Sequence, residues 1–306
     1  MRIVISGATS MIGAELTNKL LDNNHDVVAV VRPNSQKIEA LHKKTNLSIV
    51  ECSMEDYVEL GNLIDGKVDV AVSTAWNGTR GTDRNEKKLQ ENNYKNSIFF
   101  LEAMISKGCK KFLTAGSQAE YGLWTKNEKL KEDVIPNPNT EYGKYKLKFY
   151  ETARNICSDS GCELIEPRFF SLYGPMDYEG TLVISTLKKM LENKPCELTE
   201  CIQLWDFLYI DDAIDGLVKL IDDAHGGVYN FGTGYSAPLK EYVEKMKTVT
   251  NSRSELRYGV VPYPATGIVN ANPDVTKLME IGWKPSIKFE EGVKKIISLK
   301  ADFVRK

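Results

Sequence analysis

The stretch Arg2-Ile-Val-Ile-Ser-Gly-Ala-Thr-Ser-Met-Ile-Gly13 decides the fold of this 306-residue chain. Its apolar, β-branched start is typical of a buried strand, Gly7 permits a tight turn, and helical spacing of apolar residues follows over 11–21. In such an arrangement the free backbone N–H groups at the helix N-terminus can bind a phosphate. The stretch therefore predicts the nucleotide-binding turn of an α/β domain.

Further apolar runs continue the alternation of strands with helices. We expect strands at 27–31, 47–50, 68–72, 111–114 and 163–165, and helices at 85–106 and 142–157. This order predicts a Rossmann-type, doubly wound parallel sheet with a smaller C-terminal α/β substrate lobe. We place the dinucleotide-binding domain at 1–167 and the substrate lobe mainly at 168–306, and we expect 203–230 to return to the first domain.

The amino-acid composition argues against several classes of binding partner. Forty basic and forty-two acidic residues give a net charge of −2, which argues against a broad basic face for nucleic acid. No apolar run reaches the roughly 18 residues that span a bilayer, and the N-terminus lacks a signal-peptide pattern. The six cysteines have no Cys-x-x-Cys spacing and the three histidines are far apart, so we expect no metal site. We expect a cytoplasmic protein that binds neither nucleic acid nor membrane.

The end of the second predicted strand bears on the cofactor. Gly7 and Gly13 fit a dinucleotide-binding turn, with Ser10 where a middle glycine would stand. The second strand ends at Arg32, followed by Ser35, with no carboxylate to hold ribose hydroxyls. A guanidinium pairs with a 2′-phosphate, which a carboxylate would repel. We therefore expect NADP(H), with NAD(H) as the alternative if Arg32 is only a solvated strand-end charge.

A tyrosine, a lysine and a serine form the candidate catalytic group. Tyr142 and Lys146 lie one helical turn apart, and a nearby ammonium favours the phenolate. Ser117 comes just beyond the fifth predicted strand, at the edge where open α/β sheets bind ligands, and could hold a substrate carbonyl or alkoxide. The spacing alone is weak evidence for a catalytic group, because a solvent-facing Tyr/Lys pair and a Ser-Gly turn would give the same sequence pattern. The order of turn, serine and pair favours the catalytic interpretation.

On these motifs the chain resembles the extended short-chain dehydrogenase/reductases, within the NAD(P)-dependent nucleotide-sugar epimerase/dehydratase family. The glycine-rich turn, the serine stretch 117–122, the Tyr142/Lys146 pair and the loop 167–175 match family patterns. Ser171 stands in place of an asparagine and Trp205 in place of an arginine. The stretches 116–122 and 259–263 are most similar to the CDP-abequose-synthase-like 4-ketosugar reductases.

The resemblance implies site residues. Tyr142 would be the proton donor or acceptor, Lys146 would hold the nicotinamide ribose and tune Tyr142, and Ser117 would bind the sugar oxygen. The expected cofactor-binding residues are Gly7, Thr9, Ser10, Met11, Ile12, Gly13, Arg32, Ser53, Met54, Thr74, Ala75, Asn93, Lys146 and Phe170. The expected substrate-binding residues are Trp76, Gln118 and Ser171. The resemblance also implies a homodimer through a four-helix bundle of helices 85–106 and 142–157.

The residues that follow Ser117 argue against some of the reactions that the family catalyses. Gln118 and Ala119 stand where the family's 4,6-dehydratases carry an acid/base pair, so we do not expect elimination of water. Ala119 also replaces the cysteine of reductases that invert C3 and C5. Two reactions remain: NADPH-dependent reduction of a nucleotide-linked 4-keto sugar, which Arg32 favours, and 4-epimerisation with tightly bound NAD(P). A third alternative is an NADP(H)-binding sensor without turnover, against which the Tyr142/Lys146 pair argues.

Overall fold

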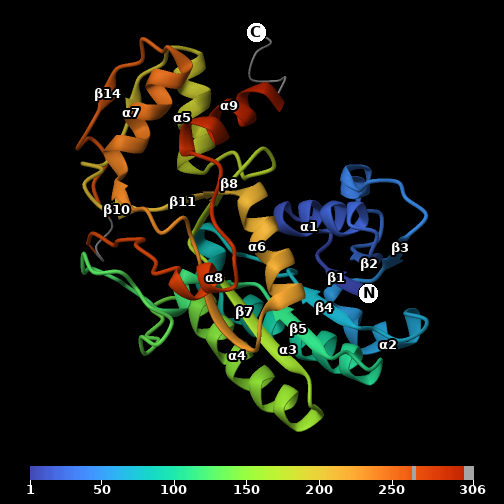
Figure 1. Ribbon diagram of the computed structural model, residues 1–306. Helices are drawn as coiled ribbons and strands as arrows, with labels where there is room; N and C mark the ends of the chain where they lie inside the picture. The colour runs from blue at the N-terminus through green and yellow to red at the C-terminus, as the bar shows by residue number, and fades with distance from the viewer. Residues whose placement is uncertain (264–266, 300–306) are drawn as a thin grey trace.

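A seven-strand path of parallel strands forms the centre of the computed structural model, which describes residues 1–263 and 267–299 (Figure 1). The strands, in spatial order, are β12 (Gly227–Phe231), β7 (Glu163–Phe169), β5 (Lys111–Thr114), β4 (Val70–Ser73), β1 (Arg2–Ser6), β2 (Asp26–Val31) and β3 (Leu47–Glu51). The short β6 (Gly116–Ser117) pairs with β7 off this path. Because every pairing in this sheet is parallel, the predicted doubly wound Rossmann-type fold is confirmed.

Helices cover both faces of the sheet. On one face lie α1 (Met11–Asp22) and α6 (Ile210–Asp223), which pack against each other, and on the other lie α3 (Lys87–Ser106) and α4 (Glu141–Ser160) (Figure 1). Neighbouring residues of β1 enter opposite cores, Ile3 and Ile5 on the α1 side and Val4 on the α3 side. This burial on both faces explains the unbroken apolar run at the start of the sequence.

A second group of elements stands beside the sheet. It holds α5 (Leu182–Leu191), α7 (Leu239–Thr250) and α9 (Phe289–Leu299), gathered at the upper left of Figure 1. Its short strand pairs are β8 (Ser171–Tyr173) with β11 (Phe207–Tyr209), β10 (Leu204–Trp205) with β13 (Ala237–Pro238), and β9 (Cys196–Glu197) with β14 (Leu256–Arg257); α8 (Thr276–Glu280) lies near β12. One apolar core joins α1 to α5, α7 and α9. Position 167 lies inside β7, so the division into two lobes there stays a prediction.

Several element bounds differ from the sequence pattern. The expected helix 85–106 begins at Lys87, because residues Gly81–Asn85 form the separate 3₁₀ helix η3 and Glu86 caps α3. The expected helix 142–157 extends over Glu141–Ser160, because Thr140 caps its start and Gly161, at φ +66°, ends it. Between β2 and β4 the connections are the short helices η1 (Gln36–Ala40), η2 (Met54–Glu59) and α2 (Leu60–Leu63).

The six cysteine thiols are free and buried. Within the described ranges, no helix combines the length and apolar character needed to cross a membrane.

Candidate active site

In the glycine-rich turn, Gly7 and Gly13 occupy positions where the Cβ of any other residue would clash with neighbouring atoms. Gly7 has φ +68°, and a Cβ there would lie 2.8 Å from both the Ala75 backbone nitrogen and Thr74 Oγ1. A Cβ at Gly13 would overlap the carbonyl oxygen of Gly7. Ser10 caps α1, since its Oγ accepts from the Gly13 N–H at 3.0 Å. The turn therefore keeps a close approach to the N-terminus of α1 open, which fits a dinucleotide pyrophosphate.

A cavity of about 190 Å³ opens beside this turn. Seven of the predicted cofactor-binding residues line it: Gly7, Thr9, Ser10, Arg32, Met54, Thr74 and Ala75. Sequence reasoning missed Lys37, on η1, which lines the same cavity near Arg32, together with Tyr57 and Asn77. Among its described lining residues, the charged ones are Arg32 and Lys37, and none is acidic.

A second cavity, of about 440 Å³, adjoins the first through Thr74 and Trp76, which line both. Eight predicted residues besides Thr74 line it: Met11, Ile12, Trp76, Ser117, Tyr142, Lys146, Phe170 and Ser171. Gln118, on η4 (Gln118–Glu120), is not among its lining residues. The structure thus brings the serine, the tyrosine and the lysine to one cavity at the carboxyl edge of the sheet, of a size typical for a small-molecule site.

Three predicted cofactor residues line neither cavity. Gly13 packs behind the turn, and Ser53 precedes η2 without a side-chain capping bond. Asn93 is buried on α3, where its side chain accepts from the Asn77 N–H at 3.1 Å and donates to the Asn77 carbonyl at 2.8 Å. Asn93 therefore holds the segment that follows β4, and its direct contact with a cofactor stays a prediction.

Sequence reasoning missed several residues that line this cavity, among them Arg80, Arg84, Trp205 and Phe207. Both arginines belong to the segment directly after β4, at the edge of the sheet where ligands bind. Arg80 Nη2 donates to Asp177 Oδ1 at 2.8 Å, and that carboxylate is buried. The position of this segment after a central strand was the available signal.

Lys146 is held under the ring of Trp76. Its Nζ donates to the Ala115 carbonyl at 2.8 Å and lies 3.8 Å from the Trp76 ring centroid and 6.0 Å from that of Tyr142. Burial lowers the pKa of Lys146 to about 8, against the opposing effect of Glu120 and Glu166. At pH 7 the ammonium form therefore prevails.

Tyr142 is buried within the same cavity. Burial raises the pKa of its phenol above the ordinary value, while a hydrogen bond with Ser117 and the charge of Arg84 lower that pKa. The Arg84 guanidinium carbon lies 4.5 Å from the ring centroid. The arrangement can move a proton to or from an oxygen bound beside Ser117.

A fully buried ionic cluster lies behind Ser117. Glu120 Oε1 accepts from the Ser117 N–H at 2.7 Å, and Ser117 Oγ accepts from the Ala119 N–H at 3.2 Å. Arg168 Nε donates to Glu120 Oε2 at 3.0 Å and to Glu166 Oε2 at 2.8 Å. Burial and the neighbouring Glu120 charge raise the pKa of Glu166 well above its usual value. The cluster fixes the backbone that carries Ser117.

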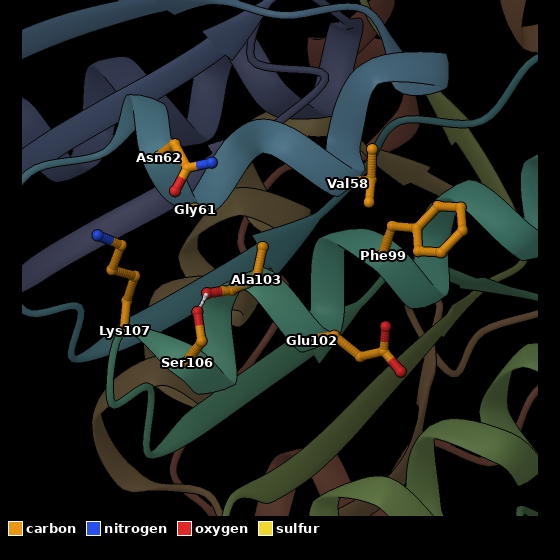
Figure 2. A pocket seen from close by; sticks show the side chains of 8 residues that line it. All are labelled: Val58, Gly61, Asn62, Phe99, Glu102, Ala103, Ser106 and Lys107. Carbon is orange, nitrogen blue, oxygen red and sulfur yellow. Dashed lines mark hydrogen bonds between the residues drawn. The ribbon is translucent and has the colours of Figure 1, made fainter.

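A separate groove lies between the η2–α2 segment and α3, with Val58 facing Phe99 and Asn62 facing Lys107 (Figure 2). Ser106 Oγ donates to the Ala103 carbonyl at its floor. None of the predicted site residues lines this groove, whose described lining residues are Val58, Gly61, Asn62, Phe99, Glu102, Ala103, Ser106 and Lys107. The two cavities at the carboxyl edge therefore remain the candidate active site.

Known proteins similar to this chain include one curated relative and two solved structures of nucleotide-sugar enzymes. The CDP-abequose synthase of Salmonella muenchen is 26% identical over 308 residues, with 98% of each chain covered. The structure of UDP-glucose 4-epimerase from Thermotoga maritima, with UDP-glucose, superimposes with a TM-score of 0.88 at 24% identity, covering 100% of both chains. UDP-glucuronic acid 4-epimerase from Bacillus cereus, in complex with NAD, gives a TM-score of 0.81 at 22% identity, covering 98% of this chain and 99% of that one.

The family model described as the NAD dependent epimerase/dehydratase family matches residues 3–232. That range contains the glycine-rich turn, Ser117, Tyr142 and Lys146, and it confirms the resemblance inferred from the sequence motifs. The chain therefore belongs to the NAD dependent epimerase/dehydratase family of enzymes.

Proposed function

We propose that this enzyme is an NADPH-dependent reductase of a nucleotide-linked 4-keto sugar. The observation that carries the proposal is the pair of cations, Arg32 and Lys37, lining the cofactor cavity without an acidic partner among the described lining residues. Two cations there suit the 2′-phosphate that distinguishes NADP(H) from NAD(H). NADPH is the usual donor for reduction, and the similarity to a CDP-abequose synthase over 98% of both chains supports the same class of reaction.

The residues of the turn fit the cofactor. The N-terminus of α1 with Gly7 and Ser10 would hold the pyrophosphate, Arg32 and Lys37 the 2′-phosphate, and Lys146 the nicotinamide ribose. When bound, the reduced dinucleotide supplies a hydride to the keto carbon of the sugar.

The chain's own residues stabilise the keto oxygen of the sugar and supply the proton that it takes up. Ser117 donates its hydroxyl hydrogen to the keto oxygen and stabilises the negative charge that develops there. Tyr142 gives its phenolic proton to that oxygen and becomes a phenolate. Lys146 stabilises the phenolate with its positive charge. Trp76, whose ring lies against the Lys146 ammonium, orients that lysine.

The direct test follows the absorbance of reduced nicotinamide with CDP-, dTDP-, GDP- and UDP-linked 4-keto sugars. Stoichiometric loss of NADPH with one of them is the expected result. Tyr142→Phe should retain NADPH affinity and lose turnover, and Arg32→Asp should shift the preference toward NADH. An unchanged NADPH preference in Arg32→Asp would remove the main support for the cofactor assignment.

The second candidate is 4-epimerisation, because the same Ser117, Tyr142 and Lys146 suffice for it. The resemblance to UDP-glucose 4-epimerase over the whole of both chains favours this alternative at the level of the fold. Interconversion of UDP-sugars without net consumption of added NADPH would establish it. Binding of NADPH with no turnover of any keto or alcohol sugar would instead indicate a sensor.

We also propose that the protein is a homodimer in the cytoplasm. Helices α3 and α4 lie side by side (Figure 1), and Tyr94 and Tyr145 pack across them with ring centroids 6.2 Å apart. Two such helix pairs would form a four-helix bundle, and six free thiols suit a reducing compartment. Light scattering coupled to size-exclusion chromatography should give twice the chain mass, and a monomer at micromolar concentration would refute the dimer.

A further inference from the structure

We propose that Arg84 is a second catalytic cation, which contacts Tyr142 and stabilises its phenolate together with Lys146. The inference rests on the proposed function in that both assign proton transfer to Tyr142. It goes further because it assigns part of the phenolate stabilisation to a residue outside the Tyr-x-x-x-Lys pair. Three features of Arg84 support it: its distance from the phenol, its charge balance and the anchoring of its segment.

Distance favours Arg84. Its guanidinium carbon is 4.5 Å from the Tyr142 ring centroid, whereas Lys146 Nζ is 6.0 Å away and lies closer to the Trp76 ring, at 3.8 Å. A guanidinium this close to a phenol ring interacts favourably with its electrons, and more strongly when the ring carries a negative charge. Arg84 is therefore the closer of the two cations to the aromatic ring of Tyr142.

Charge balance also favours Arg84. Arg80, four residues earlier, is paired with the buried Asp177 carboxylate, which compensates its charge. Within the described chain, no ion pair joins Arg84 to a carboxylate, and its guanidinium donates to the Thr79 carbonyl at 3.0 Å. The charged groups that face Tyr142 are Lys146 on α4, Arg84 on η3, Arg80 before η3, and Glu120 on η4. Of these, Arg84 is the uncompensated cation nearest the ring.

The segment that carries Arg84 is anchored. Gln90 Nε2 donates to the carbonyls of Gly78 at 3.0 Å and Asp83 at 2.9 Å. Asn85 Oδ1 accepts from the Glu141 N–H at 3.2 Å, in the first turn of α4, next to Tyr142. These bonds hold η3 against the start of α4, so the Arg84 side chain meets the phenol in a defined orientation. In catalysis the proton leaves Tyr142 for the substrate oxygen, and Arg84 stabilises the phenolate left behind.

The test measures the ionisation of Tyr142 directly, by NMR of protein labelled with ¹³C at the tyrosine ζ carbon. The Tyr142 signal is assigned by its absence in Tyr142→Phe. Arg84→Met and Arg84→Gln should each lower the acid dissociation constant of Tyr142 about tenfold. Arg84→Lys should restore most of that constant. The matched control, Arg80→Met combined with Asp177→Asn, removes the neutral Arg80–Asp177 pair as a whole and should change the constant much less.

The readout is independent of any substrate, so it separates this inference from the proposed reaction. A reductase assay that fails while the Tyr142 titration shifts as expected would overturn the proposed function alone. Equal Tyr142 titrations in the wild type and in both neutral Arg84 variants, all with the wild-type melting temperature, would overturn the role of Arg84. If Arg84→Met fails to fold, Arg84→Gln, which keeps a hydrogen-bond donor, carries the test.

Discussion

Replacing Glu166 by glutamine should remove a pH dependence of stability that the wild type shows. Glu166 and Glu120 share the Arg168 guanidinium in a site whose three side chains are almost completely buried. Two ionised carboxylates on one guanidinium would leave an uncompensated buried charge, so Glu166 takes up a proton and its pKa rises well above the usual 4.5. Glutamine mimics that protonated, neutral form.

The direction in which the free energy of unfolding changes with pH follows from proton linkage. Above pH 4.5 the unfolded chain has lost the Glu166 proton and the folded chain keeps it, until the pH passes the raised folded pKa. Across this window the group lowers the free energy of unfolding as pH rises, by about 1.4 kcal/mol per pH unit for one proton. For a chain of 306 residues this corresponds to about 2 °C of melting temperature per pH unit. Glu166→Gln has no proton to lose at this position, so its free energy of unfolding does not show this decrease with pH.

The assay is equilibrium urea unfolding of both proteins at several pH values between about 5 and 8. The stability of Glu166→Gln relative to the wild type should increase steadily with pH. Other titrating groups are common to both proteins, so the difference isolates position 166. Parallel pH profiles for the two proteins would refute the assignment of a shared proton to this cluster.

Glu120→Gln is the matched control, because it makes the same chemical change on the other carboxylate. Glu120 accepts on both oxygens, from the Ser117 N–H and from Arg168 Nε. An amide there would turn its NH₂ group toward one of these donors, at a cost of about 1–3 kcal/mol. The amide that Glu166→Gln introduces can instead accept from Arg168 and donate to Glu120. The control should therefore be less stable than Glu166→Gln at every pH.

Three further predictions concern the site. Ser117→Ala should lower kcat about 100-fold or more through loss of the hydroxyl that stabilises the substrate oxygen, with little change in NADPH affinity measured by fluorescence titration. Gly13→Ala should abolish NADPH binding and lower the melting temperature, because its Cβ would overlap the Gly7 carbonyl; Gly61→Ala, whose Cβ would lie 3.6 Å from its nearest neighbour, should do neither. The reduction rate should fall as pH rises through about 8, where Lys146 loses its proton, and a kcat profile flat to about pH 10 would contradict this role.

The parts of the site that the sequence predicted are those with local signatures. The Gly7–Gly13 turn follows a strand and opens a helix, and Tyr142 and Lys146 share a helix face. Ser117 follows the fifth strand, at the edge where ligands bind. Each of these placements follows from the chain within a few residues, and the order of strands then brings them to one edge.

The missed residues lack such signatures. Lys37 and Arg84 lie in segments whose short 3₁₀ helices carry no clear periodicity. Their positions depend on how η1 and η3 pack against the sheet and α4. Glu166 and Arg168 alternate along β7 and so point to the same face. Charges at alternate positions of a buried strand were a second signal that sequence reasoning passed over.

The proton affinity of Tyr142 is therefore a property of tertiary packing rather than of the Tyr-x-x-x-Lys spacing. Burial in the cavity raises its pKa, while Ser117 from the β5–β7 edge and Arg84 from η3 lower it. Lys146 is itself adjusted by Glu120 and Glu166, which belong to η4 and β7. A chain that keeps the pair but loses Arg84 or the Glu120–Arg168 contact would retain the motif and change its acidity. Reactivity in this fold thus has to be judged from the charges that the packing assembles around the phenol, because the motif by itself supplies only one of them.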